Sequence, residues 1–191
     1  GYHNLVQVVS KGALFGFHYR PRVDKSILAA HSEGIIALSA CLAGEVPRTF
    51  LRKGMDAALG VVNDYKSIYG DKFFLEMQVN GMEEQKRANA AILELAEATN
   101  TPLVATNDCH YLRKDDHEAH DVLLCIPTQS KVDDPKRMRF DAMDLYFKST
   151  EEMEKDFAWA PPEALSNTMR NAEMTEECNF DTKTDHLPAY D

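Results

Sequence analysis

The sequence predicts an α/β fold built on a parallel sheet. Short apolar segments rich in β-branched and aromatic residues alternate with longer segments of helical periodicity, which is the signature of βαβ units. A chain of 191 residues is long enough to bury one sizeable core. Hydrophobic residues make up 44% of the chain and charged residues 27%, which is ordinary for a globular domain. We therefore expect one domain over residues 1–191.

The first half of the chain predicts four helices and two strands. Residues 1–16 have apolar residues at helical spacing, which predicts an amphipathic helix with a buried stripe. That stripe contains Leu5, Val8, Val9 and Leu14. Asp24 is a good N-cap for a helix that begins at Lys25. The other expected elements are strands at 34–40 and 72–79 and helices at 43–53 and 55–68.

The second half is led by the clearest helix, residues 83–100, which is charged on one face and apolar on the other. Its apolar face contains Ala88, Ile92, Leu95 and Ala96. A strand follows at 103–106, and then a helix from about 114 to 126. Ser149 and Glu152 form a capping box for another short helix. We expect a long loop at 127–145, and a C-terminal extension at 146–188 whose last helix has proline in its first turn.

Composition and charge narrow the possible functions. A net charge of −10 argues against a protein that grips nucleic acid over a broad surface, because phosphate contacts require basic side chains. A small metal-centred site acting on one phosphate is compatible with that charge, since a bound cation reverses the local sign. No apolar run reaches the ~20 residues that cross a bilayer. The four cysteines are scattered, without a CxxC pair, so we expect a cytoplasmic protein with no membrane partner.

Three side chains of metal-ligating type follow expected strands. Asp108 and His110 come just after the strand at 103–106, and Cys41 comes just after the strand at 34–40. In parallel α/β folds the carboxyl ends of strands meet at one edge, where sites collect. Side chains at i and i+2 of an extended segment point the same way, so Asp108 and His110 could reach one ion. Thiolate, imidazole and carboxylate together suit zinc, and would accept manganese or iron.

Each of these residues also has a plainer interpretation. Asp108 could cap a turn before the next helix, with His110 as a polar surface group, and Cys41 could be a small buried hydrophobe. Arg20 and Arg22 are either ordinary surface charges or a phosphate clamp, because a planar guanidinium matches phosphate oxygens.

Glu76, His117 and His120 also have metal-ligating side chains, but their sequence context does not indicate a metal site. Glu76 is either an interior strand carboxylate that needs a partner or a rim residue. His117 and His120 have no HExxH or ExxH company, so we interpret them as a solvated helix start, with His120 able to hydrogen-bond across the domain.

Longer segments carry a family resemblance. They are "PRVDKSIL", "EGIIALSACLAGEVPR", "FFLEMQ", "EEQKRANAAILELA", "PLVATNDCHYLRKDDHEAHDVLLCI", "DDPKRMRF", "YFKSTEEM" and "PEALSNT". In this order they resemble the PHP (polymerase and histidinol phosphatase) domain of the bacterial DNA polymerase III alpha-subunit family. The resemblance covers the later part of that domain and extends from Gly1 to about Pro188. Because the chain starts without Met inside a helical segment, we expect it to be an excised fragment.

The resemblance implies a distorted (β/α)7-type PHP barrel, present here as a partial barrel. In metal-binding members a cluster of divalent ions lies at the carboxyl edge of the barrel, and the family's ligand positions fall on Cys41, Asp108 and His110. The implied protein is a DNA-directed DNA polymerase of DNA replication. Its PHP portion would contribute to a metal-dependent 3′–5′ exonuclease acting on the primer 3′ end of DNA, alongside other holoenzyme subunits.

The resemblance also limits the fragment. The family's opening His-x-His motif is absent, so we expect weak or no metal binding, no activity in isolation, and self-association. Two other functions are compatible with the sequence. One is a structural PHP module that braces the polymerase without metal. The other is a free-standing PHP phosphoesterase, against which the polymerase-like sequence after residue 127 argues.

Overall fold

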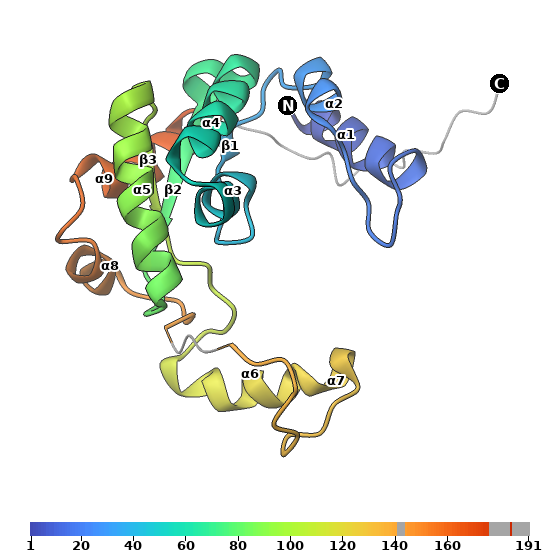
Figure 1. The fold of residues 1–191 in the computed structure, drawn as a ribbon, viewed down its shortest axis with the longest axis vertical. Coiled ribbons are helices and arrows are strands. Elements are labelled where there is room, and N and C mark those ends of the chain that lie inside the picture. Colours follow the sequence, from blue (N-terminus) through green and yellow to red (C-terminus); the bar gives the residue numbers. More distant parts are fainter. Residues whose placement is uncertain (141–143, 176–183, 185–191) are drawn as a thin grey trace.

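The computed structural model describes residues 1–140, 144–175 and 184. The helices of its first part are α1 (Tyr2–Leu14), α2 (Lys25–Ala30), α3 (Glu45–Lys53), α4 (Met55–Tyr69) and α5 (Glu83–Thr99). Those that follow are α6 (His117–Leu123), α7 (Cys125–Thr128), α8 (Thr150–Asp156) and α9 (Glu163–Glu173). The strands are β1 (Ala37–Leu38), β2 (Phe73–Gln78) and β3 (Leu103–Thr106). Helices surround a small sheet, with α1–α2 and α6–α7 extending from it as two separate arms (Figure 1).

The three strands form one parallel sheet in the order β1-β2-β3, which confirms the mixed α/β prediction. Leu75 pairs with Leu103 and Gln78 with Thr106 along the β2–β3 ladder. The β1–β2 ladder contains only two pairs, so β1 is shorter than the strand expected at 34–40. Within the described residues β1 pairs with β2 alone, and a strand with one free edge has half its backbone groups outside the ladder.

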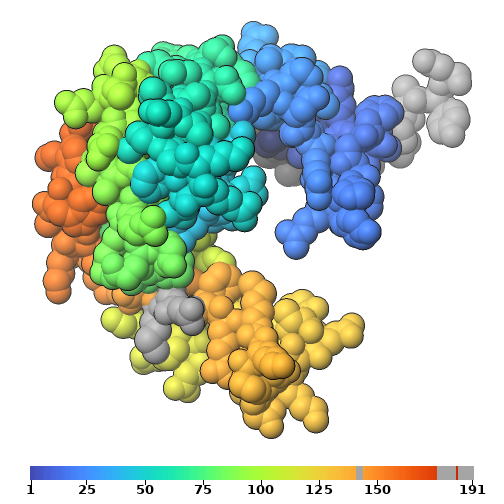
Figure 2. Space-filling view, viewed as in Figure 1, coloured from blue at the N-terminus to red at the C-terminus, as the bar shows by residue number. Residues whose placement is uncertain are grey.

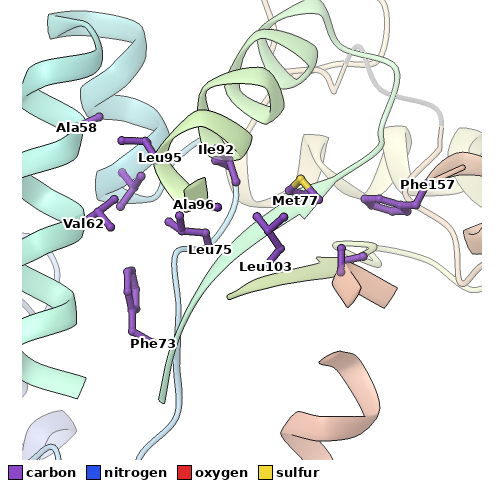
Figure 3. Packing of buried hydrophobic residues seen from close by; sticks show 13 residues of the cluster. Ala58, Val62, Phe73, Leu75, Met77, Ile92, Leu95, Ala96, Leu103 and Phe157 are labelled. Atoms are coloured by element: carbon purple, nitrogen blue, oxygen red, sulfur yellow. The ribbon is translucent and has the colours of Figure 1, made fainter. Parts of the chain in front are cut away.

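One face of the sheet packs against helices to form the core (Figure 3). Alternation along β2 turns Phe73, Leu75 and Met77 to this face, and all three are at most 1% exposed. The predicted apolar face of α5 is confirmed, because its members are all buried. They contact side chains of α4 such as Ala58 and Val62. Burial of each large apolar side chain stabilises the fold by about 1.5–3 kcal/mol.

Caps and glycines set the helix ends where the sequence predicts them. Asp24 accepts a hydrogen bond from the backbone N–H of Ile27 at 2.9 Å. Gly54 separates α3 from α4 with a φ of +86°, a conformation that side chains disfavour. The predicted capping box is present, because Ser149 and Glu152 each accept a hydrogen bond from the other's backbone N–H.

The opposite face of β2 is polar toward its carboxyl end, with Glu76 9% exposed and Gln78 3% exposed. Helix α9 packs beside β3, and Asn167 Nδ2 donates to the Leu103 carbonyl at 2.7 Å. This bond satisfies a backbone acceptor at the outer edge of the sheet, which is how exposed strand edges are blunted. The last predicted helix is confirmed as far as Glu173; residues 176–183 and 185–188 of the expected extension lie outside the described part.

Two expectations about local structure were wrong. The stripe of α1 is not buried, since Leu5 is 47% exposed, Val9 61% and Leu14 73%; of this helix only Gly12 is buried. Its apolar face has nothing to cover it among the described residues. The helix expected from about 114 to 126 is broken into a 3₁₀ turn at 114–116, α6 and α7, and α7 extends into the expected loop at 127–145. Residues 141–143 of that loop are not described. Among the described residues, no helix is both long and apolar enough to span a membrane.

Candidate metal centre

Glu76 joins the carboxyl ends of all three strands. Its carboxylate accepts from the Ala40 backbone N–H at 3.0 Å and from Gln78 Nε2 at 3.1 Å, and it also accepts from the Thr106 hydroxyl. Its own backbone N–H donates to Ser39 Oγ at 2.8 Å. Glu76 is therefore an interior carboxylate with partners from the segment after β1, from β2 and from β3, which decides the alternative left open by the sequence.

The loop after β1 places Cys41. Ala40 has a φ of +63°, a left-handed conformation that costs energy for any residue with a Cβ. The bond from its N–H to Glu76 stabilises this turn. The turn closes with Gly44, whose N–H donates to the Cys41 carbonyl at 2.7 Å. A Cβ at Gly44 would lie 2.2 Å from the Ser39 carbonyl oxygen, so the loop can be this tight only with glycine there.

Cys41 and Asp108 lie in one cavity at the carboxyl edge of the sheet. This cavity, about 180 Å³ in volume, is lined by Cys41, Leu42, Ala43, Asn80, Met82, Gln85, Asp108, Phe140 and Leu145. Cys41, Asn80 and Asp108 follow β1, β2 and β3 respectively, as the rule for parallel sheets predicts. The rest of the lining includes Gln85 of α5 and two residues from beyond α7, Phe140 and Leu145. The structure thus brings two of the three predicted ligands to the same small space.

Asp108 and His110 contact each other: His110 Nε2 lies 3.5 Å from Asp108 Oδ1. The sequence predicted that Asp108 and His110 approach each other because they lie two apart in an extended segment. That reason was wrong, because this segment is not extended. Asp108 has a φ of +54°, so the chain turns sharply there, and the turn rather than the strand alternation brings the two side chains together. His110 is held from the other side, where its backbone N–H donates to the Leu145 carbonyl at 2.8 Å.

His120 belongs to this neighbourhood, which the sequence did not show. Its ring lies 5.5 Å from that of His110 and 5.7 Å from that of Phe140, centroid to centroid. Burial, and then the neighbouring His110, lower the pKa of His120. His117 and His120 are both partly buried. His120 contacts the rings of His110 and Phe140 across the domain, whereas His117 Nδ1 lies 3.1 Å from the Lys114 carbonyl oxygen at the helix start.

The assembled donors fall short of a closed site. Among residues 1–140, 144–175 and 184 there is no group of three or more His, Cys, Asp or Glu side chains placed to hold one metal ion. The donor types fit a divalent metal, since thiolate, carboxylate and imidazole are zinc's usual ligands. What these residues offer is an Asp–His pair, with Cys41 lining the same cavity as Asp108.

The two candidate phosphate ligands lie elsewhere. Arg20 and Arg22 are exposed in the segment between α1 and α2. That segment belongs to the α1–α2 arm, which Figure 1 shows apart from the carboxyl end of β3. Neither arginine lines the cavity that holds Cys41 and Asp108. The structure therefore does not bring them together with the other predicted site residues.

Comparison with known proteins indicates the class of protein to which this chain is similar. Residues 1–80 match the model of the PHP domain family. The particular relatives are DNA polymerase III alpha subunits. The one from Thermus aquaticus is 42% identical over 179 residues, which is 92% of this chain and 15% of that subunit. Those from Treponema pallidum and Borreliella burgdorferi are 41% and 37% identical, over 94% and 100% of this chain.

The chain is thus similar over most of its length to a segment of DNA polymerase III subunit alpha, and its first 80 residues match the PHP domain family. It spans about 15% of the length of the relatives it matches.

Proposed function

We propose that this chain is the PHP portion of a replicative DNA polymerase alpha subunit and contributes to a metal-dependent site that hydrolyses phosphodiesters at DNA 3′ ends. The observation that carries the proposal is the shared cavity of Cys41 and Asp108, with His110 3.5 Å from Asp108. Its position at the carboxyl edge of a parallel sheet is where α/β folds place their chemistry. The homologous polymerase subunits supply the substrate class.

The ligands in this proposal are the Cys41 thiolate, the Asp108 carboxylate and the His110 imidazole, with zinc favoured and manganese or iron also accommodated. When bound, the metal would supply activation of a water and stabilisation of the departing 3′ oxygen. Glu76 acts as a positioning residue. It holds the turn before Cys41 through Ala40, and the strand end before Asp108 through Thr106.

The architecture in this proposal is a partial (β/α)-type PHP barrel. In it, the three parallel strands form one part of the barrel wall. Residues 1–191 form one domain with a C-terminal extension from residue 146. DNA and other subunits of the polymerase holoenzyme are its partners, in the cytoplasm. Arg20 and Arg22 would contact phosphate oxygens only of a strand long enough to reach from the cavity to the α1–α2 arm.

A second candidate is a structural PHP module that braces the polymerase without metal. The absence of a three-donor cluster among the described residues favours it. Metal analysis of the intact alpha subunit separates the two. The hydrolytic proposal expects bound zinc, manganese or iron that falls in the variants Cys41→Ala and Asp108→Asn. Equal, near-zero metal content in the parent and both variants would favour the structural module.

A further inference from the structure

A second cavity beside the candidate metal centre is lined by aromatic rings. It has a volume of about 560 Å³, within the range of small-ligand sites, and its walls include Tyr111, His120 and Phe140. The His120 ring lies 5.3 Å from Tyr111 and 5.7 Å from Phe140, centroid to centroid. The His120 ring is tilted by 46° to that of Tyr111 and by 38° to that of Phe140, so the three rings offer separate faces and edges against which another flat ring can pack.

These rings do not form a closed core. They belong to the α6–α7 lobe, which we define as residues 109–140; Figure 2 shows it in yellow and orange, apart from the blue α1–α2 arm. Only Cys125 and Arg137 are buried within this lobe. Phe140 is 37% exposed, and His120 and Tyr111 are partly exposed. A packed core would bury its aromatic side chains almost completely, so the rings face an open space.

The two cavities share a wall. Phe140 lines both the cavity of Cys41 and Asp108 and the cavity of the rings. His110 connects residues of the two cavities, because it contacts Asp108 of the first and the rings of His120 and Phe140 of the second. A ligand group among the rings would therefore have its neighbouring group close to the candidate metal centre.

The charges around the rings are compatible with a nucleotide. Asp121 lines the cavity, but the Arg137 guanidinium forms a two-pronged ion pair with its carboxylate and compensates its charge. Arg139 lines the same cavity and forms no ion pair within the described part of the chain. It offers a guanidinium for phosphate or for a base face. Glu118 on the same wall opposes it, so the rings rather than net charge must supply the binding.

We propose that the ring cavity binds the terminal nucleobase of a single DNA strand whose phosphate lies at the candidate metal centre, a proposal that rests on the hydrolytic function proposed above. Base faces stack on aromatic side chains without regard to sequence. A nucleobase held by Tyr111, His120 and Phe140 would fix the strand end beside Asp108 and His110. A chain with a net charge of −10 does not attract DNA over long distances. Contacts within the cavity would therefore have to position the substrate.

Binding of labelled oligonucleotides to the 191-residue chain tests this, with fluorescence anisotropy as the readout and EDTA present so that no hydrolysis occurs. The probes are a thymidine pentamer and the same strand with an abasic 3′-terminal sugar. We expect the abasic strand to bind about fivefold more weakly, the loss expected from one stacked base. Phe140→Leu should weaken binding of the thymidine pentamer by a similar factor and leave binding of the abasic strand unchanged. Phe140→Tyr should retain the preference for the strand that has its 3′-terminal base.

Trp159→Ala is the matched control, because Trp159 is a 50% exposed aromatic residue that lines a separate cavity beside α5. Circular dichroism melts should show that the three variants are folded. Equal affinity for the two strands, or no binding of either, overturns the proposal. Loss of the preference in Trp159→Ala instead of Phe140→Leu does so as well. Failure of the hydrolytic function would appear separately in the intact polymerase subunit, as a base preference that persists although that subunit shows no metal-dependent hydrolysis of DNA 3′ ends.

Discussion

The backbone N–H of Ala40 donates to Glu76 Oε2 at 3.0 Å, and this bond ties the left-handed turn after β1 to the middle strand of the sheet. Cys41 is the next residue in the chain, so its position depends on a carboxylate that lies 36 residues from Ala40 in sequence. The other oxygen of Glu76 accepts from Thr106 at the end of β3, two residues before Asp108. One buried side chain thus sets the geometry of both halves of the candidate metal centre.

Glu76→Ala should therefore destabilise the protein by about 1–3 kcal/mol, because it leaves the Ala40 N–H and the Thr106 hydroxyl without a buried partner. Urea unfolding followed by circular dichroism measures this. Glu94→Ala, at an exposed position of α5, is the control and should change little. If the two variants lost equal stability, the hydrogen bonds of Glu76 would have no special structural role.

In the intact polymerase subunit, Asp108→Asn or His110→Ala should abolish metal-dependent hydrolysis of DNA 3′ ends and leave nucleotide incorporation largely unchanged. Each change removes a ligand or its charge from the candidate metal centre. The assay follows shortening of a 3′-labelled oligonucleotide beside primer extension. His31→Ala, a histidine at the end of α2, is the control. Parallel loss of both activities would indicate a folding defect, and unchanged hydrolysis would exclude the pair from the site.

The isolated 191-residue chain should self-associate and hydrolyse no DNA ends with added zinc or manganese. The exposed apolar face of α1 and the free edge of β1 are surfaces that associate with other chains. Multi-angle light scattering measures the mass, and Leu14→Glu together with Phe15→Glu should lower it, since both side chains are more than 70% exposed. A compact monomer with robust activity would contradict the expectation of an incomplete barrel.

The α6–α7 lobe should loosen in acid. The hydrogen bond from Arg137 lowers the pKa of Asp121 from its ordinary value near 4. Because the folded-state pKa is the lower one, this pair stabilises the lobe above pH ~4 and is lost as pH falls through the folded-state pKa. Hydrogen exchange of residues 117–140, corrected for intrinsic rates, should therefore accelerate between pH 5 and pH 2 in the parent protein.

In the variant Asp121→Asn, the amides of residues 117–140 should already exchange faster than in the parent protein at pH 5. Their exchange rate should then change less on acidification. Asp133→Asn, an exposed aspartate of the same lobe, should behave like the parent. If the acid response were unchanged in Asp121→Asn, its cause would be the protonation of other carboxylates.

Much of the fold could be predicted from the sequence because it depends on neighbours in the chain. The apolar face of α5, the cap at Asp24 and the glycine between α3 and α4 follow from helical periodicity and backbone preference, which act within a few residues. Strands followed by ligand-type side chains likewise predicted that Cys41, Asp108 and His110 lie at one edge of a parallel sheet, and Cys41 and Asp108 line one cavity there.

The tertiary structure alone decided which distant groups become partners. Nothing local to Glu76 shows that Ala40 and Thr106 bind it, and nothing near His120 shows that His110 and Phe140 contact its ring. The exposure of Leu14 has the same cause, because periodicity predicts an apolar face but not what covers it. Local sequence sets the elements and their faces, whereas partners, exposure and the shape of a site depend on contacts between segments far apart in the chain.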